Sequence, residues 1–189
     1  MIPGMQQRNA DRTRAKILAA ATEEFAERGI AGARVQRIAE VAECNKAMLY
    51  AYFGSKDGLF DAVFSASVEE YLTVVGFDTD DLPAYAGRLF DYFEDNPARL
   101  RLTSWYRLER PAGEPLEAII AVNQSRLDDL DRAQRRRTVP KQFSSVSLLS
   151  LIQAIATNWS SMTPEYGAAV PSRLARRKAV VMAVEKILS

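Results

Sequence analysis

Residues 45–56 read Asn45-Lys46-Ala47-Met48-Leu49-Tyr50-Ala51-Tyr52-Phe53-Gly54-Ser55-Lys56. Asn45 is a favourable N-cap because its side chain can accept a hydrogen bond from a free backbone N–H, and Gly54 can end a helix in the left-handed conformation. Leu49 and Phe53 lie four residues apart, so they share a face that can pack on a core. A short helix with one buried side and one polar, aromatic side is typical of helices that enter a DNA groove. The alternative is a surface helix without a partner.

Helical patterns flank this stretch on both sides. From Asp11, apolar residues recur at helical spacing as far as Phe25, and Gly29 can end that helix. A second short helix is predicted from about Val35 to Ala42, so the three segments together predict a helix-turn-helix arrangement. We expect residues 1–10 to form a flexible arm.

The rest of the chain is also helical in pattern. A long apolar stripe begins at Lys56 and continues for about twenty residues. No segment shows the alternation of a strand, so we predict an all-α fold of about nine helices. The further helices are expected over 83–93, 97–108, 116–133, 145–162 and 171–188, with a break at Pro111, Gly113 and Pro115.

Composition narrows the class of protein. The 189 residues are 48% hydrophobic, and the longest apolar runs are too short to span a bilayer. No apolar signal segment is visible at the N-terminus, and one cysteine, Cys44, permits no internal disulfide. We therefore expect a cytoplasmic protein that does not interact with membranes. The net charge is only +1, but residues 1–16 carry four basic residues against one acidic residue. That excess suits either a DNA surface or a solvated helix start.

The chain contains no histidine. This removes the commonest general base and the commonest metal ligand, so we predict no catalytic residues, no metal and no cofactor. An enzyme based on carboxylates remains an alternative. Its strongest acidic cluster, Asp128, Asp129 and Asp131, has the pattern of an exposed helix face.

The last two predicted helices are apolar on more than one side, which indicates burial on more than one side. A second copy of the chain would supply the additional cover, so we predict a homodimer in which two helices from each subunit form a four-helix bundle. A fully internal helix pair is the alternative. The predicted dimer interface comprises Leu149, Ile152, Ala156, Val180, Val184 and Ile187.

Residues 13–64 resemble the DNA-binding domain of the TetR family of transcriptional regulators. Some positions depart from the family pattern: Glu43 stands where glycine is usual, and Arg34 stands where a threonine or serine cap is usual. Cys44, Ala47, Met48 and Gly58 also differ. The matching residues are Thr13-Arg14, Ile17-Leu18, Ala20-Ala21, Phe25 to Gly29, Val35, Ile38-Ala39, Ala42, Lys46, Leu49-Tyr50, Tyr52-Phe53, Ser55-Lys56 and Leu59.

The resemblance implies roles for particular residues. Tyr50, Tyr52 and Lys56 match positions that contact DNA phosphates, and Lys46 and Met48 match positions that face bases or phosphates. The chemistry agrees, because tyrosine hydroxyls donate to phosphate, lysine can bind guanine and methionine can contact a thymine methyl group. For both tyrosines, aromatic core packing is the alternative. The predicted DNA-binding set is Arg34, Arg37, Asn45, Lys46, Met48, Tyr50, Tyr52 and Lys56.

The resemblance also implies two domains: residues 1–55 as arm and helix-turn-helix domain, and residues 56–189 as an all-helical ligand-binding and dimerisation domain. The function it implies is a ligand-responsive repressor that binds a pseudo-palindromic operator and is released by a small, largely apolar effector. A helical adaptor protein without DNA binding is the second alternative. Aromatic residues are expected to line the effector pocket or to be plain core: Tyr92, Phe93, Trp105, Tyr106 and Trp159.

Overall fold

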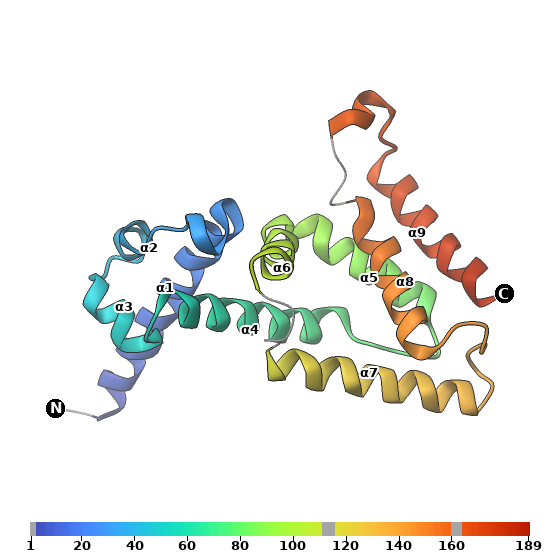
Figure 1. The fold of residues 1–189 in the computed structure, drawn as a ribbon, viewed down its shortest axis with the longest axis horizontal. Coiled ribbons are helices and arrows are strands. Elements are labelled where there is room, and N and C mark those ends of the chain that lie inside the picture. Colours follow the sequence, from blue (N-terminus) through green and yellow to red (C-terminus); the bar gives the residue numbers. More distant parts are fainter. Residues whose placement is uncertain (1–2, 111–115, 160–163) are drawn as a thin grey trace. The chain divides into compact units, whose positions relative to one another are not determined.

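The computed structural model describes residues 3–110, 116–159 and 164–189 (Figure 1). Within these ranges the chain forms nine α-helices, the 3₁₀ helix η2 and no strand, which confirms the predicted all-α fold. The predicted break at Pro111–Pro115 and the end of the helix at Met162 lie outside the described residues. The elements are α1 (Pro3–Gly32), α2 (Val35–Val41), α3 (Lys46–Phe53), α4 (Lys56–Val75), α5 (Leu82–Asp95), α6 (Pro97–Glu109), α7 (Glu117–Arg135), α8 (Ser145–Asn158), the 3₁₀ helix η2 (Pro164–Ala169) and α9 (Arg173–Leu188).

The first helix is longer than expected. It begins at Pro3, so the predicted flexible arm over residues 1–10 is wrong for the described part of that segment. Proline is well suited to the first turn of a helix, because the N–H that it lacks has no intrahelical acceptor there. Gly29 interrupts the helix with φ +72°, as its sequence position predicted.

The chain divides into two compact units that differ from the expected division at residue 56. Unit 1 comprises residues 1–68 and 101–116, and unit 2 comprises residues 69–100 and 117–189. The difference arises because α4 is one continuous helix whose first part packs with α1 to α3, and because the second half of α6 packs on the same unit. Helix periodicity alone does not show where along a helix its packing partners change.

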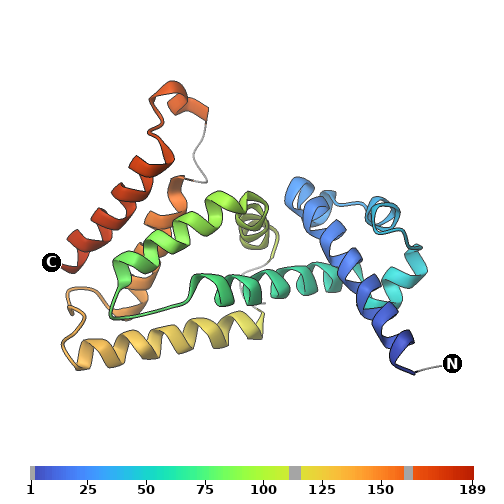
Figure 2. The same ribbon diagram turned by 180° about the vertical axis from the view of Figure 1, so that it is seen from behind.

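In unit 1, α2 and α3 lie beside α1 (Figures 1 and 2). Their shared core contains Ile17, Ile38 and Leu49, each at most 1% exposed. The rings of Phe25 and Phe60 meet edge to face with centroids 5.2 Å apart, which joins α1 to α4. Leu49 is thus the buried anchor of α3 that the sequence predicted.

In unit 2, α5 packs against both α8 and α9, and this packing corrects the predicted dimer interface. Of the six residues assigned to it, five are buried inside the single chain: Leu149, Ile152, Ala156, Val180 and Val184. The sixth, Ile187, is partly buried against the same core. The amphipathic face of α5 supplies the cover that the sequence analysis had attributed to a second chain. The alternative, an internal helix pair, therefore describes these side chains.

Candidate nucleic-acid interface

Helix α3 is fixed at both ends by its own sequence. The side chain of Asn45 accepts a hydrogen bond from the Met48 N–H at 2.8 Å, as predicted for an N-cap. Gly54 has φ +74°, and its N–H donates to the Tyr50 carbonyl at 2.8 Å. Ser55 then caps α4 by accepting from the Gly58 N–H at 2.9 Å. The caps therefore fix where α3 begins and ends and where α4 starts.

The outer side of α3 is open. Met48, Tyr50 and Tyr52 are 40%, 43% and 37% exposed, so neither tyrosine is a core residue. The Tyr52 hydroxyl donates to the Ala10 carbonyl at 3.4 Å, which ties this face to α1. Phe53, expected to be wholly core, is instead partly buried and lies under the Arg14 guanidinium, 5.6 Å from its ring centroid.

The turn between α2 and α3 forms without glycine. The Cys44 N–H donates to the Ala39 carbonyl at 2.9 Å and the Glu43 N–H donates to the Glu40 carbonyl at 3.2 Å, which is a Schellman motif. Glu43 occupies its left-handed position with φ +56°, at a strain of about 1–2 kcal/mol for a residue with a Cβ. Its carboxylate pairs with Lys16 on α1, and this partner lowers the Glu43 pKa.

Cys44 occupies the position after this left-handed residue, where a small apolar side chain can pack back on the helix. It is partly buried, and burial raises the pKa of its thiol. A protonated thiol is a poor nucleophile, so this environment favours a packing role for Cys44.

Glu24 of α1 organises the start of α2, and the sequence analysis did not identify it. Arg34 makes no side-chain cap, but its N–H donates to Glu24 Oε1 at 3.0 Å. Glu24 is 5% exposed and also pairs with the Nε atoms of Arg28 at 3.5 Å and Arg37 at 3.2 Å. A carboxylate from a neighbouring helix thus replaces the missing cap. The position of Glu24 in the sequence does not predict this role, because the contact joins two different helices.

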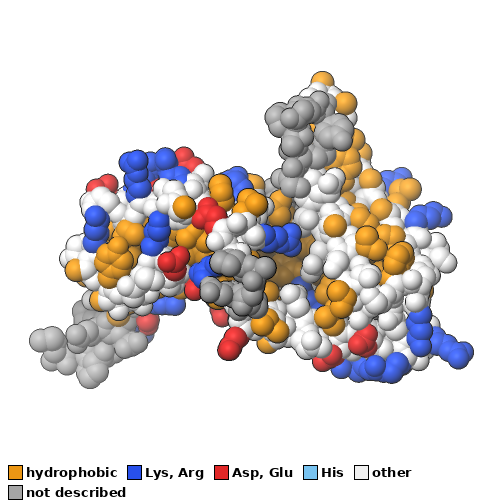
Figure 3. Space-filling model, in the orientation of Figure 1, with side chains coloured by type: hydrophobic (Ala, Val, Ile, Leu, Met, Phe, Trp, Pro, Cys, Tyr) orange, Lys and Arg blue, Asp and Glu red, His pale blue; other side chains and the backbone are white. Residues whose placement is uncertain are grey.

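The predicted basic residues fall into two groups. Lys56 is partly buried and donates to the carbonyls of Ala31 at 3.1 Å and Ala33 at 3.4 Å, so it joins the start of α4 to the end of α1. Arg37 is held by Glu24. The side chains of Arg34 and Lys46 are exposed and form no ion pair within the part of the chain that the structure describes. Figure 3 shows Lys and Arg side chains around a hydrophobic patch over α2 and α3.

The five aromatic residues predicted to line one pocket are divided between the units. Trp105 and Tyr106 belong to unit 1. Trp105 donates to the Ala26 carbonyl at 3.3 Å, and a Cβ at Gly29 would lie only 2.8 Å from its ring, so glycine permits this approach. Tyr106 stacks on Phe64 with centroids 4.4 Å apart. Both therefore hold α6 against unit 1.

Tyr92, Phe93 and Trp159 belong to unit 2, where they form or flank its core. The Tyr92 and Phe93 rings lie 5.2 Å apart and both contact Tyr71, with centroid distances of 5.7 and 6.2 Å. This aromatic group is the part of the predicted pocket lining that the fold brings together.

A buried cation, Arg126 on α7, lies beside that group. Arg126 on α7 is 5% exposed. Its Nη1 donates to the Tyr71 hydroxyl at 2.8 Å, and its guanidinium lies 4.8, 5.5 and 5.8 Å from the ring centroids of Tyr71, Phe77 and Tyr85. Its Nη2 is buried without a hydrogen-bond partner. Burying an ion costs several kcal/mol, and each ring offsets about 0.5–2 kcal/mol.

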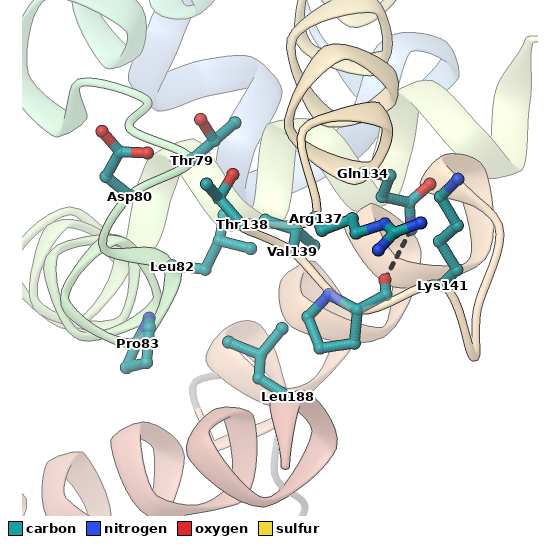
Figure 4. Close-up of a pocket in the computed structure, with 11 residues that line it drawn as sticks. Thr79, Asp80, Leu82, Pro83, Gln134, Arg137, Thr138, Val139, Lys141 and Leu188 are labelled. Carbon is teal, nitrogen blue, oxygen red and sulfur yellow. Dashed lines mark hydrogen bonds between the residues drawn. The ribbon is translucent and has the colours of Figure 1, made fainter.

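A separate pocket of about 550 Å³ opens elsewhere on unit 2 (Figure 4). It is lined by four residues around the start of α5, by residues 137–141 after α7, by Gln134 and by Leu188; the four are Thr79, Asp80, Leu82 and Pro83. Gln134 donates to the carbonyls of Pro140 and Phe143, both at 2.9 Å, and so fixes the connection to α8. None of the five predicted aromatic residues lines this pocket.

The basic run begins with Arg135, the last residue of α7, and continues through Arg136 and Arg137 in the turn that follows it. Thr138 N–H donates to the Ala133 carbonyl at 3.0 Å and Arg137 has φ +64°, so this is a second Schellman motif without glycine. Positive charge at a helix C-terminus is favourable, which gives the run a structural role.

Neither a metal site nor a membrane-spanning helix emerges from the described ranges. No group of three or more potential ligands is placed to hold a metal ion there. No helix there has the length and apolar character needed to cross a bilayer. The carboxylates considered for an enzyme lie on α7, where Asp129 pairs with Arg132 and Asp128 accepts from Gln124 at 2.9 Å.

Comparison with known proteins agrees with this geometry. Residues 17–63 match the family model described as bacterial regulatory proteins, tetR family, and residues 81–186 match that of the Tetracyclin repressor-like C-terminal domain. The chain is 37% identical over 163 residues to the HTH-type transcriptional repressor SCO4008 of Streptomyces coelicolor, covering 85% of this chain and 84% of that protein. It is 36% identical over 102 residues to the HTH-type transcriptional repressor NicS of Pseudomonas putida, covering 50% and 48% of the two chains.

Among solved structures, the transcriptional regulator SCO4942 from Streptomyces coelicolor superposes with a TM-score of 0.82 at 42% identity. The match covers 93% of this chain and 97% of that one. The similarity therefore extends over both units.

Proposed function

This chain belongs to the TetR family of bacterial regulatory proteins and is a ligand-responsive transcriptional regulator, and we propose that it is a homodimeric repressor that binds a pseudo-palindromic operator. The observation that carries the proposal is the exposed face of α3, presented by a helix that Leu49 and two caps hold in place. Its relatives SCO4008 and NicS are named as repressors, which favours repression over activation. A small effector that prefers the conformation unable to bind DNA releases the operator.

On the DNA, α3 lies in the major groove. Lys46 and Met48 face bases, and the Tyr50 hydroxyl donates to a phosphate. The Tyr52 hydroxyl donates its one proton to the Ala10 carbonyl in the free chain, so it reaches a phosphate by exchanging that acceptor. Arg34 and Arg37 reach the backbone from the start of α2. Lys56 has two carbonyl acceptors of its own, so it acts on DNA chiefly by fixing the N-terminus of α4 beside a phosphate.

The dimer forms through the outer faces of α8 and α9. These faces expose apolar side chains although their inner faces are buried on α5: Leu151 is 36% exposed, Leu174 77% and Met182 48%. The exposed Ala154 and Ala179 are small enough to let two helices approach closely. Two-fold symmetry then places two copies of α3 on successive half-sites of the operator.

The test of DNA recognition begins with duplexes enriched from a random pool by the wild-type protein. We expect a pseudo-palindromic consensus, with affinity that falls steeply as salt rises. Lys46→Ala should weaken binding and make the salt dependence shallower, because it removes a positive charge from the DNA-facing surface. Met48→Ala should leave the salt dependence unchanged and alter preference among sites by about 1 kcal/mol. Fluorescence anisotropy at several salt concentrations measures both.

Tyr50→Phe tests the phosphate contact without changing the shape of α3, since it keeps the ring and removes only an exposed hydroxyl. We expect it to weaken binding to all enriched sequences alike. If no palindromic sequence is enriched, or if all three variants bind like the wild type, α3 does not contact DNA and the repressor proposal fails.

The test of assembly is the mass in solution by light scattering. The wild type should be a dimer, and Met182→Glu should produce a folded monomer because it places charge on an apolar contact. Lys141→Glu, on the exposed connection between α7 and α8, serves as the control for added negative charge. A monomeric wild type would overturn the dimer.

A further inference from the structure

Unit 2 contains a buried charge that the chain itself does not balance, whereas the buried charge of unit 1 is balanced. Among the described residues, Glu24 in unit 1 and Arg126 in unit 2 are the buried side chains that carry a charge at neutral pH. Glu24 has three cationic or N–H partners, whereas Arg126 forms no ion pair with any carboxylate in the described ranges. A buried guanidinium that faces rings instead of carboxylates is a site prepared for an anion.

The surroundings of Arg126 limit what that anion can be. Its Nη1 is already committed to the Tyr71 hydroxyl, and Nη2 is the donor without an acceptor. The Tyr71 hydroxyl in turn lies 2.8 Å from that of Tyr85, so both hydroxyls have a partner within the group and Nη2 is the donor left for a ligand. Planar carboxylates match the planar donors of arginine.

The walls of the site are aromatic. Tyr71 packs on Tyr92 and Phe93, and Phe77 meets the Tyr85 ring edge to face at 5.0 Å. Tyr71 and Phe77 are only partly buried, so the group is not sealed inside the core. Burial raises the pKa of Tyr71 further above neutral pH, so its hydroxyl stays uncharged and adds no competing negative charge beside Arg126.

We propose that Arg126 anchors the carboxylate of the effector, which is a small organic acid with an aromatic or apolar body that packs among these rings. This inference rests on the proposed function in that the molecule bound in unit 2 is the inducer. It changes the expected effector from a largely apolar molecule to an acid. Binding moves the carboxylate from water to a partner that lacks any other counter-charge, so affinity depends on the ionised group.

The experiment uses the full chain and four acids, each paired with its neutral amide: benzoate, phenylacetate, indole-3-acetate and octanoate. Thermal denaturation followed by circular dichroism reports binding, since a ligand that binds the folded state raises the melting temperature. We expect at least one acid to raise it and its amide to have little effect. If no acid stabilises the protein more than its amide, the proposal is overturned.

Arg126→Met tests the residue itself. The ligand-free variant should melt at a higher temperature than the wild type, because it removes an unpaired buried charge, and the affinity for the responding acid should fall by about thirtyfold or more in calorimetric titration. Arg126→Lys keeps the charge but loses the planar donor pair, so it should retain a weaker response. A lower melting temperature or failure to fold in Arg126→Met would show that Arg126 is structural.

Arg132→Met is the matched control on α7, because Arg132 is exposed and pairs with Asp129. It should respond to the acid as the wild type does. Anisotropy of the ligand-free wild type on enriched duplexes is measured in parallel. Loss of DNA binding there would refute the repressor, whereas an absent acid response with intact DNA binding would refute only the role of Arg126.

Discussion

Glu24 and Arg126 are both buried and charged, one in each unit, and their partners differ. Glu24 accepts from the Arg34 N–H and pairs with Arg28 and Arg37. Arg126 has one hydroxyl, three aromatic rings and an unsatisfied Nη2. A buried charge whose partners belong to the chain fixes the elements that carry those partners. A buried charge without such partners favours binding of an oppositely charged ligand.

The largest loss of stability is expected when a charge is placed in an apolar core that contains no partner for it. Val184 is fully buried against α5, so Val184→Glu should destabilise unit 2 by about 4 kcal/mol or more. Urea denaturation followed by circular dichroism measures this. Lys141→Glu on the exposed connection between α7 and α8 is the control and should change stability little. A folded, monomeric Val184→Glu protein would instead restore Val184 to the dimer interface.

Removing the satisfied charge should have the next largest effect. Glu24→Ala leaves the Arg34 N–H without its acceptor and two guanidinium groups without their buried partner. We expect a loss of about 2–3 kcal/mol in unfolding free energy, together with weaker DNA binding because α2 loses its cap.

Glu27→Ala provides the comparison for this change. Glu27 pairs with the same two arginines, at 3.3 and 3.9 Å, but its side chain is 59% exposed. Exposed pairs contribute little, so this variant should remain close to the wild type in urea denaturation. Equal losses for both variants would show that burial of Glu24 has no special role.

A smaller effect is expected at the single hydroxyl that Arg126 holds. Tyr71→Phe keeps the ring but removes the acceptor, so the ligand-free protein should lose about 1–2 kcal/mol. Because the pKa of Tyr71 is raised, folding favours its protonated form. Its contribution is therefore complete below pH 10 and declines as pH rises above that value.

Alkaline titration of stability separates these contributions. The wild type should lose stability above about pH 10, and Tyr71→Phe should lose less over the same range. Identical slopes would mean that Tyr71 ionises as freely in the folded chain as in the unfolded one. Tyr50→Phe is the control, since Tyr50 is exposed.

The smallest effect is expected at the exposed pair of Lys16 and Glu43. Glu43→Gly loses that pair but relieves the left-handed backbone at φ +56°. We expect stability to rise by about 0.5–1 kcal/mol in thermal denaturation. Arg137→Gly makes the same change at φ +64° after α7. A fall in melting temperature for Glu43→Gly alone would show that the Lys16 pair outweighs the backbone strain.

Local signals in the sequence predicted most of the helices and the ends of α3. Asn45, Gly54 and Ser55 act on backbone groups within a few residues, so their roles follow from position alone. The position of Leu49 in the core follows from helical periodicity in the same way. The exposed residues of α3 could be predicted because they are the ones that lie outside its buried face.

The tertiary structure decided which surfaces the helices meet. Periodicity showed that α8 and α9 are apolar on more than one side, but only packing showed that α5 covers Ile152 and Val184. The same limit applies to Glu24 and Arg126, because the environment of a charge depends on residues distant in the chain. Trp105 and Tyr92 were grouped by composition, yet the fold places them in different units. Sequence determines what each helix can bury, and the contacts between helices determine which charges are left with partners.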